Sequence, residues 1–209
     1  MQPVFLDIHR SGELFGGEAI STVNYQRDGL EKVLGLLDKW IESVISIGFD
    51  TLFLDEPHAG NETLKFITSI YQKYKDLVHF YVCFCDDTFT RLTDKDIIRL
   101  PIKNVGLSAY FWTNDDSKIE KTLRIWIARL LKLRPDNHDI WIQGFDLPKG
   151  CEHVPVLVYN IAKELGVKNF GFWAYKSAEA TSAKRAINYK FVWKQTCNLF
   201  NNSAEIMIS

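Results

Sequence analysis

The chain has 209 residues, 46% of them hydrophobic and 24% charged, which are ordinary values for a globular protein with one large domain. Its formal net charge of −1 gives no electrostatic reason to expect a nucleic-acid or membrane partner. No segment reaches the ~18 apolar residues of a membrane span, and no basic region followed by an apolar stretch marks a signal peptide. We therefore expect a cytoplasmic protein.

The cysteines have the pattern of buried free thiols and not that of a disulfide framework. No CxxC spacing is present for zinc or redox chemistry. Cysteine is among the most buried residue types, and it stays reduced inside cells. We expect this state for Cys83, Cys85, Cys151 and Cys197.

The first elements in the chain are a strand, a long loop and a helix. A strand is predicted at residues 4–8, and a glycine-containing loop at 11–25. Such long loops in compact domains are usually functional or mobile. Apolar residues then recur at helical spacing over residues 28–47. Gly48 follows, where a left-handed helix cap is expected.

The stretch at residues 51–58 is the centre of the prediction. A short apolar run leads directly into Asp55, Glu56, Pro57 and His58. Such a run is typical of a strand buried on both faces, as in a parallel sheet. Proline cannot donate to a sheet ladder, so the strand should end there. Its carboxyl end would then present two carboxyl groups and a histidine.

The alternation of helix and strand continues to the end of the chain. Thr93 is a plausible N-cap, and Gly166 is expected to end a helix. Further strands are predicted at 79–85, 105–111, 139–145 and 169–173, and further helices at 62–74, 94–100, 117–133, 154–165 and 178–199.

Six strands that alternate with helices predict parallel βαβ units and an α/β fold. An open doubly wound sheet and a closed barrel both fit this pattern. Polar and aromatic residues gather at the carboxyl ends of all the predicted strands and not at their starts, which favours a barrel whose loops converge on one mouth. A standard barrel has eight strands and ~250 residues. We therefore predict a single (β/α) TIM-barrel-like domain over residues 1–209 that is incomplete or irregular.

Several polar and aromatic residues lie at or just after predicted strand ends, where α/β proteins place their ligands. The aromatic ones are suited to stacking on sugar rings, and the polar ones to binding hydroxyl groups. The candidates for substrate binding are Asp7, His9, His58, Asp86, Tyr110, Trp112, Gln143, Trp173 and Tyr175.

Three of these strand ends resemble one large TIM-barrel clan of retaining glycoside hydrolases. Asp55-Glu56-Pro57 resembles the Asn-Glu-Pro that ends the fourth strand of that clan. Phe172-Trp173-Ala174-Tyr175 is similar to its eighth-strand ending, where an aromatic residue floors the sugar subsite. Ile140-Trp141-Ile142-Gln143-Gly144-Phe145 resembles a seventh-strand ending of some glycoside hydrolases with TIM-barrel folds.

The resemblance implies a glycoside hydrolase acting on a carbohydrate, with Glu56 as the acid/base. Asp55 stands where the clan has an asparagine, and it would orient Glu56 or bind a hydroxyl group. The clan's nucleophilic glutamate on the seventh strand has no counterpart here. Gln143 and Asp146 are the nearest residues, and Asp146 is the leading second carboxylate. Its segment also has the composition of an ordinary turn.

Other functions fit parts of the same pattern. Asp55 and Glu56 would be a structural pair if Glu56 contacts an arginine or lysine of a neighbouring strand. The missing nucleophile favours a carbohydrate-binding barrel without catalysis. A metal-dependent barrel hydrolase is the third alternative, with ligands drawn from Asp7, His9, His58, Asp86 and Asp146. No GxGxxG or GxxxxGK[ST] spacing is present, so we expect no nucleotide cofactor.

Overall fold

The computed structural model describes residues 5–9, 30–57, 61–144 and 147–173. These residues form a parallel α/β fold, as predicted. The chain divides into two compact units, residues 1–107 and residues 108–209.

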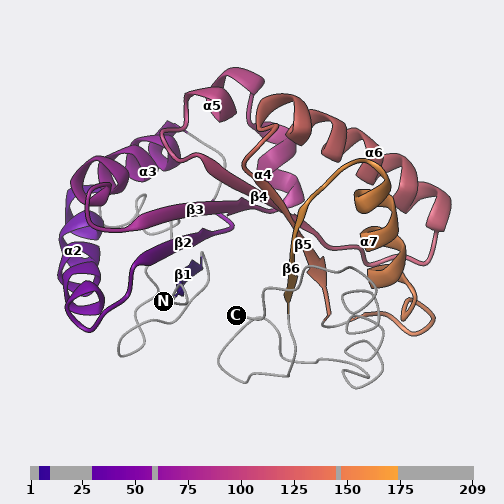
Figure 1. The fold of residues 1–209 in the computed structure, drawn as a ribbon, viewed down its shortest axis with the longest axis horizontal. Helices are drawn as coiled ribbons and strands as arrows, with labels where there is room; N and C mark the ends of the chain where they lie inside the picture. Colours follow the sequence, from indigo (N-terminus) through magenta and orange to yellow (C-terminus); the bar gives the residue numbers. More distant parts are fainter. Residues whose placement is uncertain (1–4, 10–29, 58–60, 145–146, 174–209) are drawn as a thin grey trace. The chain divides into compact units, whose positions relative to one another are not determined.

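In the described residues of the first unit, strands and helices alternate (Figure 1). The strands pair in chain order and all pairs are parallel, β1 with β2, β2 with β3 and β3 with β4. The elements are β1 (Phe5–His9), α2 (Leu30–Ser46), β2 (Thr51–Asp55), α3 (Asn61–Tyr74), β3 (His79–Phe84), α4 (Asp86–Arg91), α5 (Asp94–Arg99) and β4 (Asn104–Ala109), whose last two residues belong to the second unit.

Local signals in the sequence explain where these helices begin and end. Gly48 follows α2 with a φ of 100°, and its amide donates to the carbonyl of Ile45 at 3.0 Å. A side chain at this φ would be strained, so glycine suits the position. Thr93 caps α5 and exchanges hydrogen bonds with Asp96 in a capping box. Both predicted caps are confirmed.

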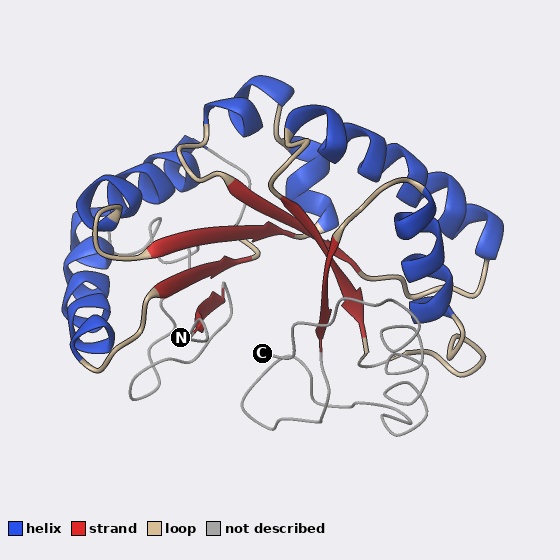
Figure 2. Ribbon diagram, in the orientation of Figure 1, coloured by secondary structure: helices blue, strands red, loops and turns tan. Residues whose placement is uncertain are grey.

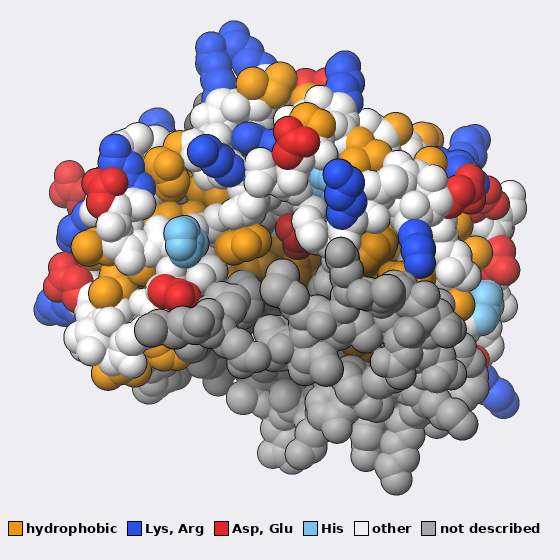
Figure 3. Space-filling view, in the orientation of Figure 1, with side chains coloured by type: hydrophobic (Ala, Val, Ile, Leu, Met, Phe, Trp, Pro, Cys, Tyr) orange, Lys and Arg blue, Asp and Glu red, His pale blue; other side chains and the backbone are white. Residues whose placement is uncertain are grey.

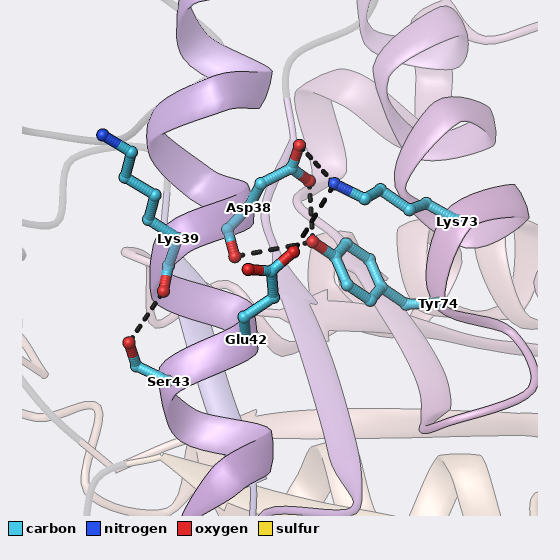
Figure 4. A network of polar contacts seen from close by, with 6 residues as sticks. All are labelled: Asp38, Lys39, Glu42, Ser43, Lys73 and Tyr74. Atoms are coloured by element: carbon cyan, nitrogen blue, oxygen red, sulfur yellow. Dashed lines mark hydrogen bonds and ion pairs between the residues drawn. The ribbon is translucent and has the colours of Figure 1, made fainter.

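A polar network joins α2 to α3 (Figure 4). Lys73 Nζ lies 2.6 Å from Asp38 Oδ2, and the Tyr74 hydroxyl donates to Asp38 Oδ1 at 2.8 Å. Burial, together with the hydrogen bond to Asp38, raises the pKa of Tyr74 to about 12. The phenol is therefore protonated near neutral pH, and its hydrogen bond to Asp38 joins the two helices.

In the second unit, β5 and β6 also form a parallel pair. Helices α6 and α7 pack against each other, and α7 also contacts β5 (Figure 2). Gly166 ends α7 with a φ of 94°, as predicted. The elements are α6 (Asp116–Leu133), β5 (His138–Gln143), α7 (Val154–Glu164) and β6 (Asn169–Trp173).

The predicted strands are present, and several of their ends are shifted by one or two residues. Strand β3 stops at Phe84, and α4 follows at once, a short helix that the prediction lacks. Strand β4 stops at Ala109, two residues before the predicted end. The predicted loop at 11–25 and final helix at 178–199 lie outside the described residues.

Two further expectations concern membranes and thiols. None of the helices in the described part of the chain combines the length and apolar character that a membrane span needs. Cys83, Cys85 and Cys151 are buried free thiols, as predicted, whereas Cys197 lies outside the described residues.

Candidate functional site

The carboxyl end of β2 carries the two acids that the sequence singles out. Asp55 is the last residue of the strand and is half-buried. Glu56 follows it and is 8% exposed. The Glu56 amide donates to the Cys83 carbonyl of β3 at 2.7 Å, so the sheet ladder extends one residue beyond the strand. This bond anchors the backbone of Glu56 at the sheet edge.

The backbone of Glu56 has an unusual conformation. Its φ is 46°, and among the described residues it is the non-glycine residue with a positive φ. The left-handed region costs an ordinary residue roughly 1–2 kcal/mol. Residues held in such a conformation are concentrated at functional sites, where the surrounding structure compensates for the strain. A buried glutamate at the carboxyl end of a parallel strand fits that description.

The register of the strands places Asp55 on the sheet face away from the helices. The Phe80 ring on β3 lies 5.4 Å from Tyr71 of α3, so Phe80 faces the helix layer. Cys83 lies three positions further along β3 and therefore on the opposite face. Asp55 is in register with Cys83 and shares this face.

Strand β1 adds two of the predicted residues to the same sheet. Asp7 is in register with Phe53, and His9, the last residue of β1, is in register with Asp55. Only the backbone of β1 is described. The carboxyl ends of β1 and β2 are therefore neighbours, as the sequence predicts.

The segment after β4 is held by Gln143 of β5. Gln143 is 1% exposed, and its Oε1 accepts a hydrogen bond from the Phe111 amide at 2.8 Å. The Phe111 ring stacks on Trp126 of α6, with the centroids 5.6 Å apart. Phe111 thus lies buried between half-buried Tyr110 and Trp112, which is 56% exposed.

The remaining predicted residues are less informative. Asp86 opens α4 and is exposed, so it belongs to a helix and not to the end of a strand. Trp173 is the last residue of β6, and only its backbone is described. Asp146, His58 and Tyr175 lie outside the described residues.

One half-buried acid was missed by the sequence reasoning, because strand starts were expected to carry no polar residues. Asp139 is the second residue of β5, and Trp141 Nε1 donates a hydrogen bond to its Oδ2. Burial raises the pKa of Asp139 to about 6, although the Trp141 bond acts in the opposite direction. Asp139 is four residues before Gln143, roughly 13 Å along the strand. The alternation Asp139, Trp141, Gln143 was the available signal, since it places all three on one face.

Metal binding and thiol chemistry have little support among the described residues. No group of three or more histidine, cysteine or acidic side chains there is arranged to hold a metal ion. Burial, with the nearby charges of Glu152 and Asp116, raises the pKa of the Cys151 thiol, which keeps it protonated and unreactive. Basic and acidic side chains are interspersed on the face shown in Figure 3, in keeping with the small net charge.

The comparisons add no family to this description. No protein-family model matches the sequence, and no curated protein is significantly similar to it.

Proposed function

We propose that the protein is a glycoside hydrolase with a (β/α) TIM-barrel-like fold, in which Glu56 is the acid/base. The observation that carries the proposal is the state of Glu56. It is buried, its backbone is left-handed, and it follows the last residue of a parallel strand. Glycoside hydrolysis needs a carboxyl group shielded from bulk water next to the leaving oxygen.

The barrel is proposed because the two faces of the strands differ. In each unit the helices contact apolar residues of one face, through Tyr71 and Phe80 in the first and Tyr159 and Phe170 in the second. The opposite face carries polar residues such as Asp55 and Gln143. A barrel wall has this composition when a polar site opens at its mouth.

The other roles follow from the same proposal. Asp55 orients Glu56 or binds a sugar hydroxyl, and Tyr110 and Trp112 supply aromatic surface. Asp146 is the proposed second carboxylate. Glycosidases need such a partner either as a nucleophile or as the base that activates water.

The experiment is Glu56→Gln, tested on a panel of 4-nitrophenyl glycosides. Losing the acid/base should lower kcat by about 10²–10⁴-fold. The amide is isosteric, so Tm should stay within about 2 °C of wild type. Asp139→Asn is the control, a half-buried acid at the other end of its strand, and it should retain activity. Unchanged turnover in Glu56→Gln would sink the proposal.

A second function, carbohydrate binding without hydrolysis, is favoured by Gln143. The resemblance expects a nucleophilic glutamate on this strand, but the side-chain oxygen of Gln143 is engaged by the Phe111 amide. Calorimetric binding of disaccharides without release of reducing sugar would identify this function. Hydrolysis that depends on Glu56 would exclude it.

A further inference from the structure

We propose that Gln143 is a positioning residue, and that the segment it holds, Tyr110–Trp112, is a stacking subsite for a pyranose ring. The ligand class rests on the proposed function. The positioning role rests on the contacts around Phe111.

Gln143 provides a hydrogen-bond acceptor just beyond the end of β4. Strand β4 stops at Ala109, so the backbone beyond it has left the strand. Phe111 is buried, and a buried amide without a partner costs free energy. Gln143 Oε1 supplies the acceptor at 2.8 Å from a position 32 residues away in the chain.

The Phe111 ring is the second fixed point. It stacks on Trp126 with an interplanar angle of 18° and a centroid separation of 5.6 Å. Phe111 is therefore held through its backbone by Gln143 of β5 and through its ring by Trp126 of α6, and we call these two contacts the clamp. Tyr110 and Trp112 flank this clamp, so their backbone positions are set before any ligand arrives. A site organised in advance binds more tightly, because less conformational entropy is lost on binding.

The exposed aromatic surface beside the clamp indicates the kind of ligand. Trp112 is 56% exposed, and the flat face of an indole packs against an apolar ring face. Two carboxylates that follow Trp112 in the chain are engaged within the protein. Asp115 caps α6 by accepting from the Lys118 amide at 3.0 Å, and Asp116 pairs with His153 at 2.7 Å. An indole face of this kind suits a ring with an apolar face, as in a pyranose.

The test uses unlabelled disaccharides, because a nitrophenyl group would itself stack on tryptophan. Cellobiose, xylobiose, mannobiose and galactobiose are titrated into the full chain carrying Glu56→Gln, and binding is measured by calorimetry. For the disaccharide that binds best, Trp112→Ala should weaken binding about tenfold. Gln143→Leu, which removes the acceptor, should weaken it about five- to tenfold and accelerate hydrogen exchange at the Phe111 amide.

Two variants serve as matched controls. Gln143→Glu keeps an oxygen acceptor for the Phe111 amide and should restore binding to within about twofold of the parent. Ile125→Ala removes a side chain of α6 that is 61% exposed, and it should leave binding unchanged. If Gln143→Leu does not fold, Trp126→Leu tests the same clamp by removing the ring partner of Phe111.

The outcomes separate this inference from the proposed function. Binding that is unchanged in Gln143→Leu, while the Phe111 amide exchanges faster, overturns the positioning role. Hydrolysis by the parent chain with unaltered KM in Trp112→Ala overturns the subsite and leaves the hydrolase standing. Disaccharide binding that depends on Gln143, without hydrolysis by the chain that retains Glu56, supports the subsite and overturns the hydrolase. No binding of any sugar overturns both.

Discussion

Glu56, which is buried, and Asp139, which is half-buried, are both acids on parallel strands, yet their settings differ. Glu56 lies just beyond the carboxyl end of β2, in a left-handed backbone conformation. Asp139 lies at the amino end of β5, within regular strand, and is bonded to Trp141. Both positions shield a carboxyl group. Only the carboxyl end of a parallel strand opens onto the loops that bind ligands.

A shielded position by itself does not identify a catalytic acid. Asp139 has the perturbed pKa that often marks active sites, but its strand position favours a role in the packing of β5 against β6. Glu56 combines burial with backbone strain and the favourable strand end.

The largest effect on stability is expected from Asp139→Asn. Since the pKa of Asp139 rises from 3.8 to about 6 on folding, the native state retains a proton that the unfolded state loses. Stability should therefore fall as pH rises between about 4 and 6, by about 3 kcal/mol in total. The asparagine variant lacks this penalty and should be more stable at pH 8. Urea unfolding of both proteins from pH 4 to 8 measures the difference, and a pH-independent difference would contradict the assignment.

Gly171→Ala should lower stability by about 1–3 kcal/mol. Gly171 is in register with Trp141, and a Cβ atom at Gly171 would lie 2.6 Å from Trp141 Cε2. The indole therefore needs glycine on β6 to keep its place beside Asp139. Thermal unfolding measures the loss.

Gly35→Ala is the matched control for that substitution. Gly35 is exposed in α2, and nothing lies within 4 Å of the added carbon. Alanine should stabilise this helix by about 0.8–1 kcal/mol. Equal effects of the two substitutions would contradict the close approach of Trp141.

The smallest expected effect on stability distinguishes backbone strain at Glu56 from the loss of its side-chain contacts. Glycine accepts a φ of 46° without cost. We therefore expect Glu56→Gly to be more stable than Glu56→Ala by about 1 kcal/mol. At Asp55, within regular strand, the order should reverse, with alanine more stable by about 0.5–1 kcal/mol. Chemical denaturation of the four variants tests this, and the same order at both positions would rule out strain at Glu56.

Much of the fold was predictable because its signals are local. The helix period identified α2 and α6, and Thr93 and Gly48 marked helix ends. The predicted limits of β6 match the structure. Helix α4 was missed because Asp86 and Asp87 resemble the polar end of a strand, and acidic residues are equally favourable in the first turn of a helix.

The candidate site was predictable in part. The apolar run before Asp55 and Glu56 placed both acids at the end of a strand, where the structure has them. The same reasoning left open whether Gln143 binds a ligand or satisfies the backbone. Its oxygen accepts the Phe111 amide, a partner that no local pattern specifies.

The sequence by itself determined the alternation of strands and helices, the caps and the polar strand ends, since these depend on residues within one or two turns of each other. Only the tertiary structure decided the left-handed backbone of Glu56, the shielding of Asp139 and the bond between Gln143 and Phe111. Each of these depends on which strands become neighbours and in what register, and that choice is made by the packing of the whole sheet.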